Sequence, residues 1–135
     1  MAAKMSPVPT LRKYGSLEEL LLDKDLASLG DSYVNFVYSL AMSQKLKRPV
    51  GAKVDNQTLA EAVTRSGLRR FLPHRVDRQT RGDAAEALLV FAWLDDLLDL
   101  NDCTDVLSRE DDATEAFANL LQDVLRKMGV THEHP

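Results

Sequence analysis

The stretch DAAEALLVFAWL, residues 83–94, decides the fold. Within it Leu88 to Leu94 is a run of seven apolar or aromatic residues, and no helix-breaking residue stands between Ala84 and Leu100. A helix that is hydrophobic on every side lies at the centre of a fold or at a subunit interface. The sequence therefore predicts a central helix over residues 84–100, opened by a capping pattern at residues 80–83.

Spacing and capping residues predict further helices on both sides of this stretch. In the second helix, Leu26, Leu29 and Tyr33 begin a series of apolar residues three and four apart, which is typical of an amphipathic helix. The other expected elements are a short helix opened by a capping box at Ser16–Glu19, a helix from Asp25 to about Gln44, a helix from Asp55 or Asn56 to Gly67, a short turn over Leu68–Leu72, and a helix from Asp112 to Met128. The pattern indicates an all-α fold.

The composition is that of a single soluble domain. Of 135 residues, 44% are hydrophobic and 28% are charged, which places the chain among globular proteins. We expect one helical domain over residues 15–129, with tails at 1–14 and 130–135. No apolar stretch reaches the roughly 18 residues of a membrane span, and residues 1–10 lack a secretory apolar block. Together with the single Cys103, this favours a cytoplasmic protein that has no membrane partner.

The net charge of −4 is distributed unevenly along the chain. Residues 44–81 carry a net charge of +7, whereas residues 82–135 carry −10. The basic segment could therefore bind a polyanion although the average is acidic. The alternative is that these charges only solvate helix faces.

Three carboxylates lie inside predicted helices that are otherwise apolar. Asp31 follows Gly30 within the second helix, and Asp83 and Glu86 share a face at the start of the central helix. Neighbouring carboxylates repel each other, and a bound divalent cation would remove that cost. The structural alternative is that Asp83 and Glu86 complement the positive end of the helix dipole and that Asp31 belongs to a polar face.

Around these carboxylates the sequence resembles the catalytic domain of the ribonuclease III family. The text KDLASLGDSYV, residues 24–34, is similar to the family signature ERLEFLGDAVL, and GDAAEALLVFAWLD, residues 82–95, is similar to ADxxEALIGAIYLD. Between them, residues 56–72 fit the family pattern of an N-x-x-LA helix followed by GL-x-x-x-L. The resemblance implies the all-helical ribonuclease III endonuclease fold over most of the chain.

The resemblance also implies an activity. It implies a homodimeric endoribonuclease, a phosphodiester hydrolase that cuts double-stranded or structured RNA to 5′-phosphate and 3′-hydroxyl ends. Asp31, Asp83 and Glu86 would be the catalytic residues and the ligands of Mg²⁺, for which Mn²⁺ could substitute. Because no double-stranded RNA-binding domain is expected after Asp95, the catalytic domain itself would bind the RNA that it processes. The candidate RNA-binding residues are Lys45, Lys47, Arg48, Lys53, Arg75, Arg78 and Arg81.

Three positions depart from the family signature. The Glu four residues before the signature Asp is Ala27 here, an earlier Glu is Lys24, and the aromatic residue that inserts into the partner subunit is Ser28. The mini-ribonuclease III branch also has Ala at the first of these positions and is active, which favours an enzyme. The alternatives are a catalytically inactive, dimeric RNA-binding or scaffolding domain with the same fold, and a helical interaction protein whose likeness is accidental.

Other possible sites are weaker. A calcium loop from Asp99 to Glu110 is rejected because its obligatory Gly is Thr104. The acidic residues at 95–102 are predicted to form an exposed turn. Cys103 lacks a His partner and is predicted to be a small core residue, while His132 and His134 belong to the predicted tail.

Overall fold

The computed structural model describes residues 13–130, and that part of the chain is 72% helical and contains no strand. This confirms the all-α prediction. The elements in chain order are α1 (Leu17–Leu21), α2 (Lys24–Leu46), α3 (Asn56–Ser66), the 3₁₀ helix η1 (Leu68–Phe71), α4 (Arg78–Leu94), α5 (Leu100–Arg109) and α6 (Ala113–Lys127). His132 and His134, like most of both predicted tails, lie outside the described residues. The domain limits at 15 and 129 stay a prediction.

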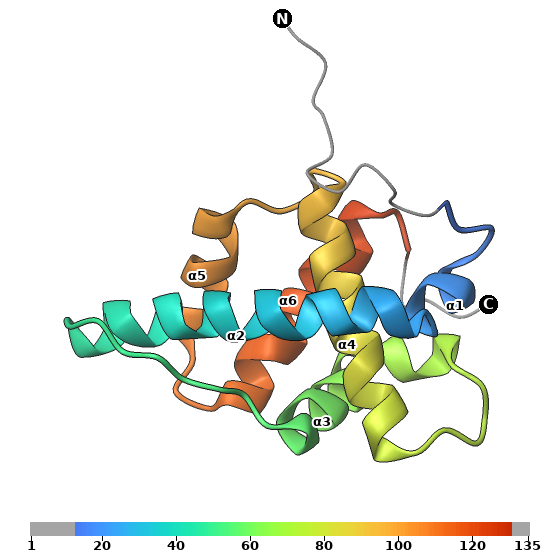
Figure 1. Ribbon diagram of the computed structural model, residues 1–135, viewed down its shortest axis with the longest axis horizontal. Coiled ribbons are helices and arrows are strands. Elements are labelled where there is room, and N and C mark those ends of the chain that lie inside the picture. Colours follow the sequence, from blue (N-terminus) through green and yellow to red (C-terminus); the bar gives the residue numbers. More distant parts are fainter. Residues whose placement is uncertain (1–12, 131–135) are drawn as a thin grey trace, which may run out of the picture.

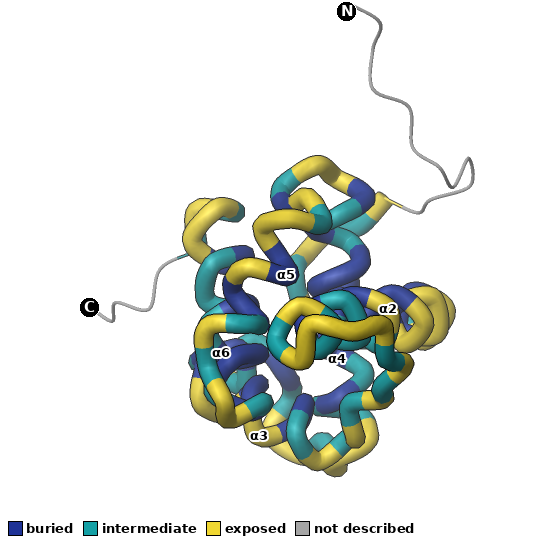
Figure 2. Tube along the Cα trace, turned by 90° about the vertical axis from the view of Figure 1, so that its left-hand side faces the viewer, coloured by how far each residue is buried: buried dark blue, intermediate teal, exposed yellow. Residues whose placement is uncertain are grey.

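Helix α4 is the centre of the molecule, as its all-round hydrophobicity predicts. It packs against α1, α2, α3 and α6, and α2 crosses it on the face turned to the viewer in Figure 1. Ala84, Leu88 and Leu89 are fully buried, and Figure 2 shows α4 in the middle of the fold, between α2 and α6. In the apolar run only Phe91 and Trp93 are partly exposed, and this burial on most sides explains why the segment shows no polar stripe.

Both ends of α4 differ from the predicted bounds. The helix begins at Arg78 because the Asp77 side chain, and not Thr80, caps it by accepting a hydrogen bond from the Thr80 backbone amide at 2.8 Å. It ends at Leu94, and the left-handed backbone of Asp96 turns the chain away. Asp83 and Glu86 therefore lie beyond the first turn, where the helix dipole has little effect. The dipole does not account for them.

The sequence does not predict helix α5. Asp95 and Asp96 form the predicted exposed turn, whereas Asp99 and Asp102, although exposed, start a helix. Asp99 accepts a hydrogen bond from the Asp102 backbone amide at 2.7 Å, and the Asp102 side chain bonds back to the Asp99 amide. This capping box opens α5, which packs on α2 and α6. Cys103 on α5 is fully buried 3.0 Å from the Tyr33 hydroxyl, which confirms it as a core residue.

Helix α2 runs along most of the long axis of the molecule (Figure 1). Its N-cap is Asp23 and not Asp25, because the Asp23 carboxylate accepts hydrogen bonds from the amides of Asp25 and Leu26. It ends at a left-handed Lys47, after which residues 48–55 return alongside it to α3. Among residues 13–130, none of the helices has the length and apolar character needed to cross a membrane.

Candidate active site

A cleft of about 400 Å³ opens where α2 and α4 cross. All three carboxylates singled out from the sequence line it: Asp31 comes from α2, and Asp83 and Glu86 come from α4. The complete lining is Lys24, Ala27, Ser28, Asp31, Val54, Asn56, Gln79, Asp83 and Glu86. Residues far apart in the sequence are thus brought to one concave surface.

Two glycines allow the helices that form the cleft to approach closely. A Cβ atom on Gly30 would lie 2.1 Å from the backbone oxygen of Glu86 and 2.5 Å from its carbonyl carbon. A Cβ atom on Gly82 would lie 2.1 Å from Nδ2 of Asn56 at the start of α3. The unusual Gly30-Asp31 pair therefore has a structural cause: Gly30 brings α2 against α4, and the next residue then faces Glu86.

Glu86 is the most deeply buried of the three carboxyl groups, in a residue only 8% exposed. Burial raises its pKa to about 8, and a hydrogen bond with the Asp31 carboxyl and the negative charges of Asp31 and Asp83 act in the same direction. Near neutral pH the Glu86 carboxyl therefore keeps its proton. A cation between these groups would relieve the same repulsion that the proton relieves.

Asp83 faces two donors of the protein itself. Its Oδ2 accepts from Lys24 Nζ at 2.8 Å, and its Oδ1 accepts from Gln79 Nε2 at 2.9 Å. The Asp83 side chain is 15% exposed, whereas that of Lys24 is 62% exposed. The Asp83 carboxylate therefore forms an ion pair with the Lys24 ammonium group. The sequence alone did not predict this ion pair.

The carboxylate donor set of the cleft fits a hard divalent cation. Carboxylate oxygens are the ligands that Mg²⁺ prefers. Within residues 13–130, however, no three His, Cys, Asp or Glu side chains converge as a ready metal-binding group. Both oxygens of Asp83 are instead engaged by Lys24 and Gln79.

A polar stripe on α2 fixes both Asp31 and the opposite wall of the cleft. Asn35 donates to Asp31 Oδ1 at 3.4 Å and accepts from the Val54 backbone amide at 3.0 Å. One and two turns further on, the hydroxyl groups of Ser39 and Ser43 exchange hydrogen bonds with the backbones of Ala52 and Val50. These positioning residues were missed in the sequence, although polar residues at 31, 35, 39 and 43 follow the four-residue spacing of one helix face.

The candidate RNA-binding residues do not form one cluster. Arg78 and Arg81 line a second cleft, of about 340 Å³, together with Arg65, which the sequence interpretation did not include. Lys45 instead donates to the Glu110 backbone oxygen at 2.9 Å and pairs with Asp111 at 3.4 Å. The others, Lys47, Arg48, Lys53 and Arg75, are exposed.

A comparison with known families matches residues 24–131 to the family described as Ribonuclease III. The chain belongs to the ribonuclease III family. The matched region runs from the first residue of α2 beyond the end of α6, so it includes both helices that carry the carboxylates. Membership of the ribonuclease III family confirms the expected fold and indicates a nuclease-like role. The curated proteins compared with the chain gave no match.

Proposed function

We propose that this protein is a divalent-metal-dependent endoribonuclease that cleaves double-stranded or structured RNA to 5′-phosphate and 3′-hydroxyl ends. The observation that carries this proposal is that Asp31 and Glu86 face each other across the Gly30 contact, with Asp83 in the same cleft. In a ribonuclease III family member, such a set of hard oxygen donors suits phosphodiester hydrolysis.

Asp31, Asp83 and Glu86 would hold Mg²⁺, or Mn²⁺ in its place. When bound, the ion would activate water for attack on the scissile phosphorus and neutralise charge on the departing 3′ oxygen. The chain's own residues orient these ligands: the Asn35 amide is hydrogen-bonded to Asp31, and the Gln79 amide to Asp83. Such supporting hydrogen bonds keep ligands in position.

RNA would bind to the catalytic domain itself. Exposed Lys47, Arg48, Lys53, Arg75 and Arg78 supply positive charge for phosphate groups. We expect the Kd for a long RNA duplex to rise steeply with salt. The double variant Arg75→Gln, Arg78→Gln should lower the slope of log K against log salt by about 1 for each arginine that neutralises a phosphate. Binding that does not change between low and moderate salt would contradict this part of the proposal.

A second copy of the chain would complete the enzyme as a homodimer, as the family resemblance implies. On α2, Leu29 and Phe36 are 40% and 53% exposed, and their seven-residue separation places them on one side of the helix. This apolar surface is the candidate contact. Light scattering on the purified protein should give twice the chain mass of 15.1 kDa, and Phe36→Glu should give the monomer mass.

Cleavage of a long duplex in Mg²⁺ and in Mn²⁺ tests the activity. Asp83→Asn and Glu86→Gln should each abolish cleavage but leave the helical circular dichroism spectrum unchanged, whereas Asp105→Asn, on the exposed side of α5, should cleave like the wild type. Ala27 and the Lys24–Asp83 ion pair favour one competing function, that of a catalytically inactive RNA-binding or scaffolding domain. Duplex binding without cleavage in either metal would establish that competing function.

A further inference from the structure

We propose that the Lys24 ammonium group takes the place of one divalent cation in the carboxylate cleft, so that the cleft accommodates a single Mg²⁺ or Mn²⁺ beside it. This inference rests on the proposed function, because it concerns the metal stoichiometry of the same site. It starts from one contact: Lys24 Nζ lies 2.8 Å from Oδ2 of Asp83.

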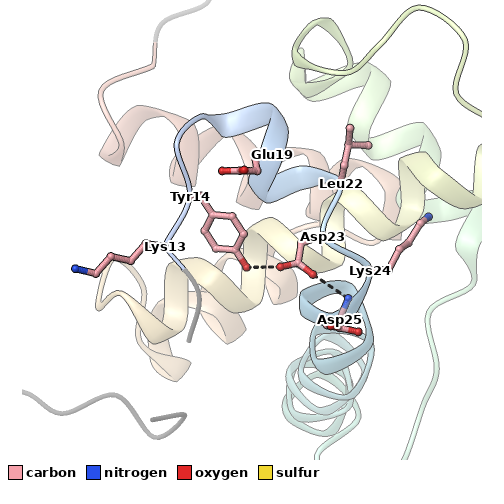
Figure 3. A pocket seen from close by; sticks show the side chains of 7 residues that line it. All are labelled: Lys13, Tyr14, Glu19, Leu22, Asp23, Lys24 and Asp25. Carbon is pink, nitrogen blue, oxygen red and sulfur yellow. Dashed lines mark hydrogen bonds between the residues drawn. The ribbon is translucent and has the colours of Figure 1, made fainter. Parts of the chain in front are cut away.

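The position of Lys24 is set by the start of α2. Asp23, the residue before it, caps α2 through two backbone amides and also accepts a hydrogen bond from the Tyr14 hydroxyl at 2.7 Å. In Figure 3 Tyr14 and Asp23 meet on one side of the α1–α2 junction, and the Lys24 side chain extends away from Tyr14. The cap thus directs Lys24 towards α4, where Asp83 lies.

The charge of the cleft favours one divalent ion. Its charged lining residues are Lys24, Asp31, Asp83 and Glu86, which together carry a charge of −2 when all are ionised. A single divalent cation neutralises this charge, whereas two would leave an excess of positive charge next to the lysine. In the family signature the positions of Lys24 and Ala27 are both Glu, so the two replacements remove negative charge from the cation site.

The geometry supports the same conclusion. The cleft wall one turn before Asp31 is Ala27, whose methyl group offers no oxygen ligand. Lys24 lies one turn before Ala27 on α2 and reaches across to α4. The part of the cleft that would need a carboxylate to hold a second cation is therefore lined by a methyl group and an ammonium group.

Counting bound Mn²⁺ by the loss of the free-ion electron paramagnetic resonance signal tests this proposal without relying on activity. The wild-type chain should bind one Mn²⁺. Lys24→Gln should also bind one, about tenfold more tightly at low salt, because the ion no longer competes with a nearby positive charge. Lys24→Glu, which restores a carboxylate, should bind a second Mn²⁺. Lys127→Gln on α6, a matched loss of one lysine near the other end of α4, should behave like the wild type.

Each of the other outcomes overturns a defined claim. Two Mn²⁺ ions on the wild-type chain would overturn the inference, as would an affinity that Lys24→Gln leaves unchanged or weakens; a weakened affinity would mean that Lys24 holds Asp83 in position. Mn²⁺ binding that is insensitive to Lys24 leaves the proposed nuclease intact. Absence of Mn²⁺ binding in all four proteins would overturn the metal-dependent function together with this inference.

Discussion

Replacing Gly30 with Ala tests whether the α2–α4 contact creates the cleft. The new methyl carbon would lie 2.1 Å from the Glu86 backbone oxygen, whereas ordinary contacts of this kind begin at about 3.4 Å, so one helix must shift by more than an ångström. The atom in its way is backbone in the buried central helix and cannot move aside as a flexible side chain would. Overpacking costs about 1–3 kcal/mol or somewhat more, and the better helix propensity of Ala returns about 1 kcal/mol. We expect a net loss of about 2 kcal/mol.

Urea unfolding followed by circular dichroism measures this loss, and Gly51→Ala is the matched control. No atom lies within 4 Å of the Cβ position of Gly51, so that variant should stay within about 0.5 kcal/mol of the wild type or gain slightly from a stiffer unfolded chain. Gly30→Ala should also lose duplex cleavage, because separating the helices moves Asp31 away from Glu86. Equal stability of the two variants would refute the close contact.

Three further predictions concern single side chains. In metal-free buffer, between the ordinary pKa of 4.5 and about pH 8, Glu86 is protonated in the folded chain but ionised in the unfolded chain. The free energy of unfolding should therefore fall by roughly 2–4 kcal/mol as the pH rises through this window. Glu86→Gln should flatten that profile, and an unchanged decline in the variant would contradict the assignment. Asn35→Ala should cost about 1–2 kcal/mol in urea unfolding by leaving the Val54 amide without its partner; the exposed Ser32→Ala is the control, and equal stability of the two would count against the polar stripe. Burial raises the pKa of the Cys103 thiol to about 11, so a disulfide reagent at pH 8 should label it only in the unfolded chain, and rapid labelling of the native protein would disprove its burial.

The sequence predicts the fold class and the three carboxylates of the site because both depend on short-range patterns. The run from Leu88 to Leu94 needs burial on every side wherever it lies, and the structure places it at the centre. The Asp-x-x-Glu motif places Asp83 and Glu86 one helical turn apart. The Gly-Asp motif places Asp31 next to Gly30, where the two helices come into close contact. The structure brings Asp31 and Glu86 together in one cleft, although their roles in binding metal stay a prediction.

The remaining features depend on where helices start and on how they cross. Asp77 competes with Thr80 as the cap of α4, and pattern alone does not decide between two such residues separated by three positions. The acidic residues before α5 were assigned to an exposed turn, but Asp99 and Asp102 satisfy each other's backbone amides and start a helix. The ion pair between Lys24 and Asp83 joins residues 59 positions apart, and only the crossing of α2 over α4 brings them together.

The polar stripe on α2 links the carboxylate Asp31 to the chain segment that forms the facing wall of the cleft. One wall, with Asp31, is helix α2 itself. The other wall, with Val54, is attached to that same helix by hydrogen bonds with the side chains of Asn35, Ser39 and Ser43. Val54 also packs against the hydrophobic core, so this segment is held by apolar contact as well as by hydrogen bonds. Because Asn35 is bonded to both Asp31 and Val54, a substitution in this row of side chains changes the alignment of a carboxylate and the width of the cleft together.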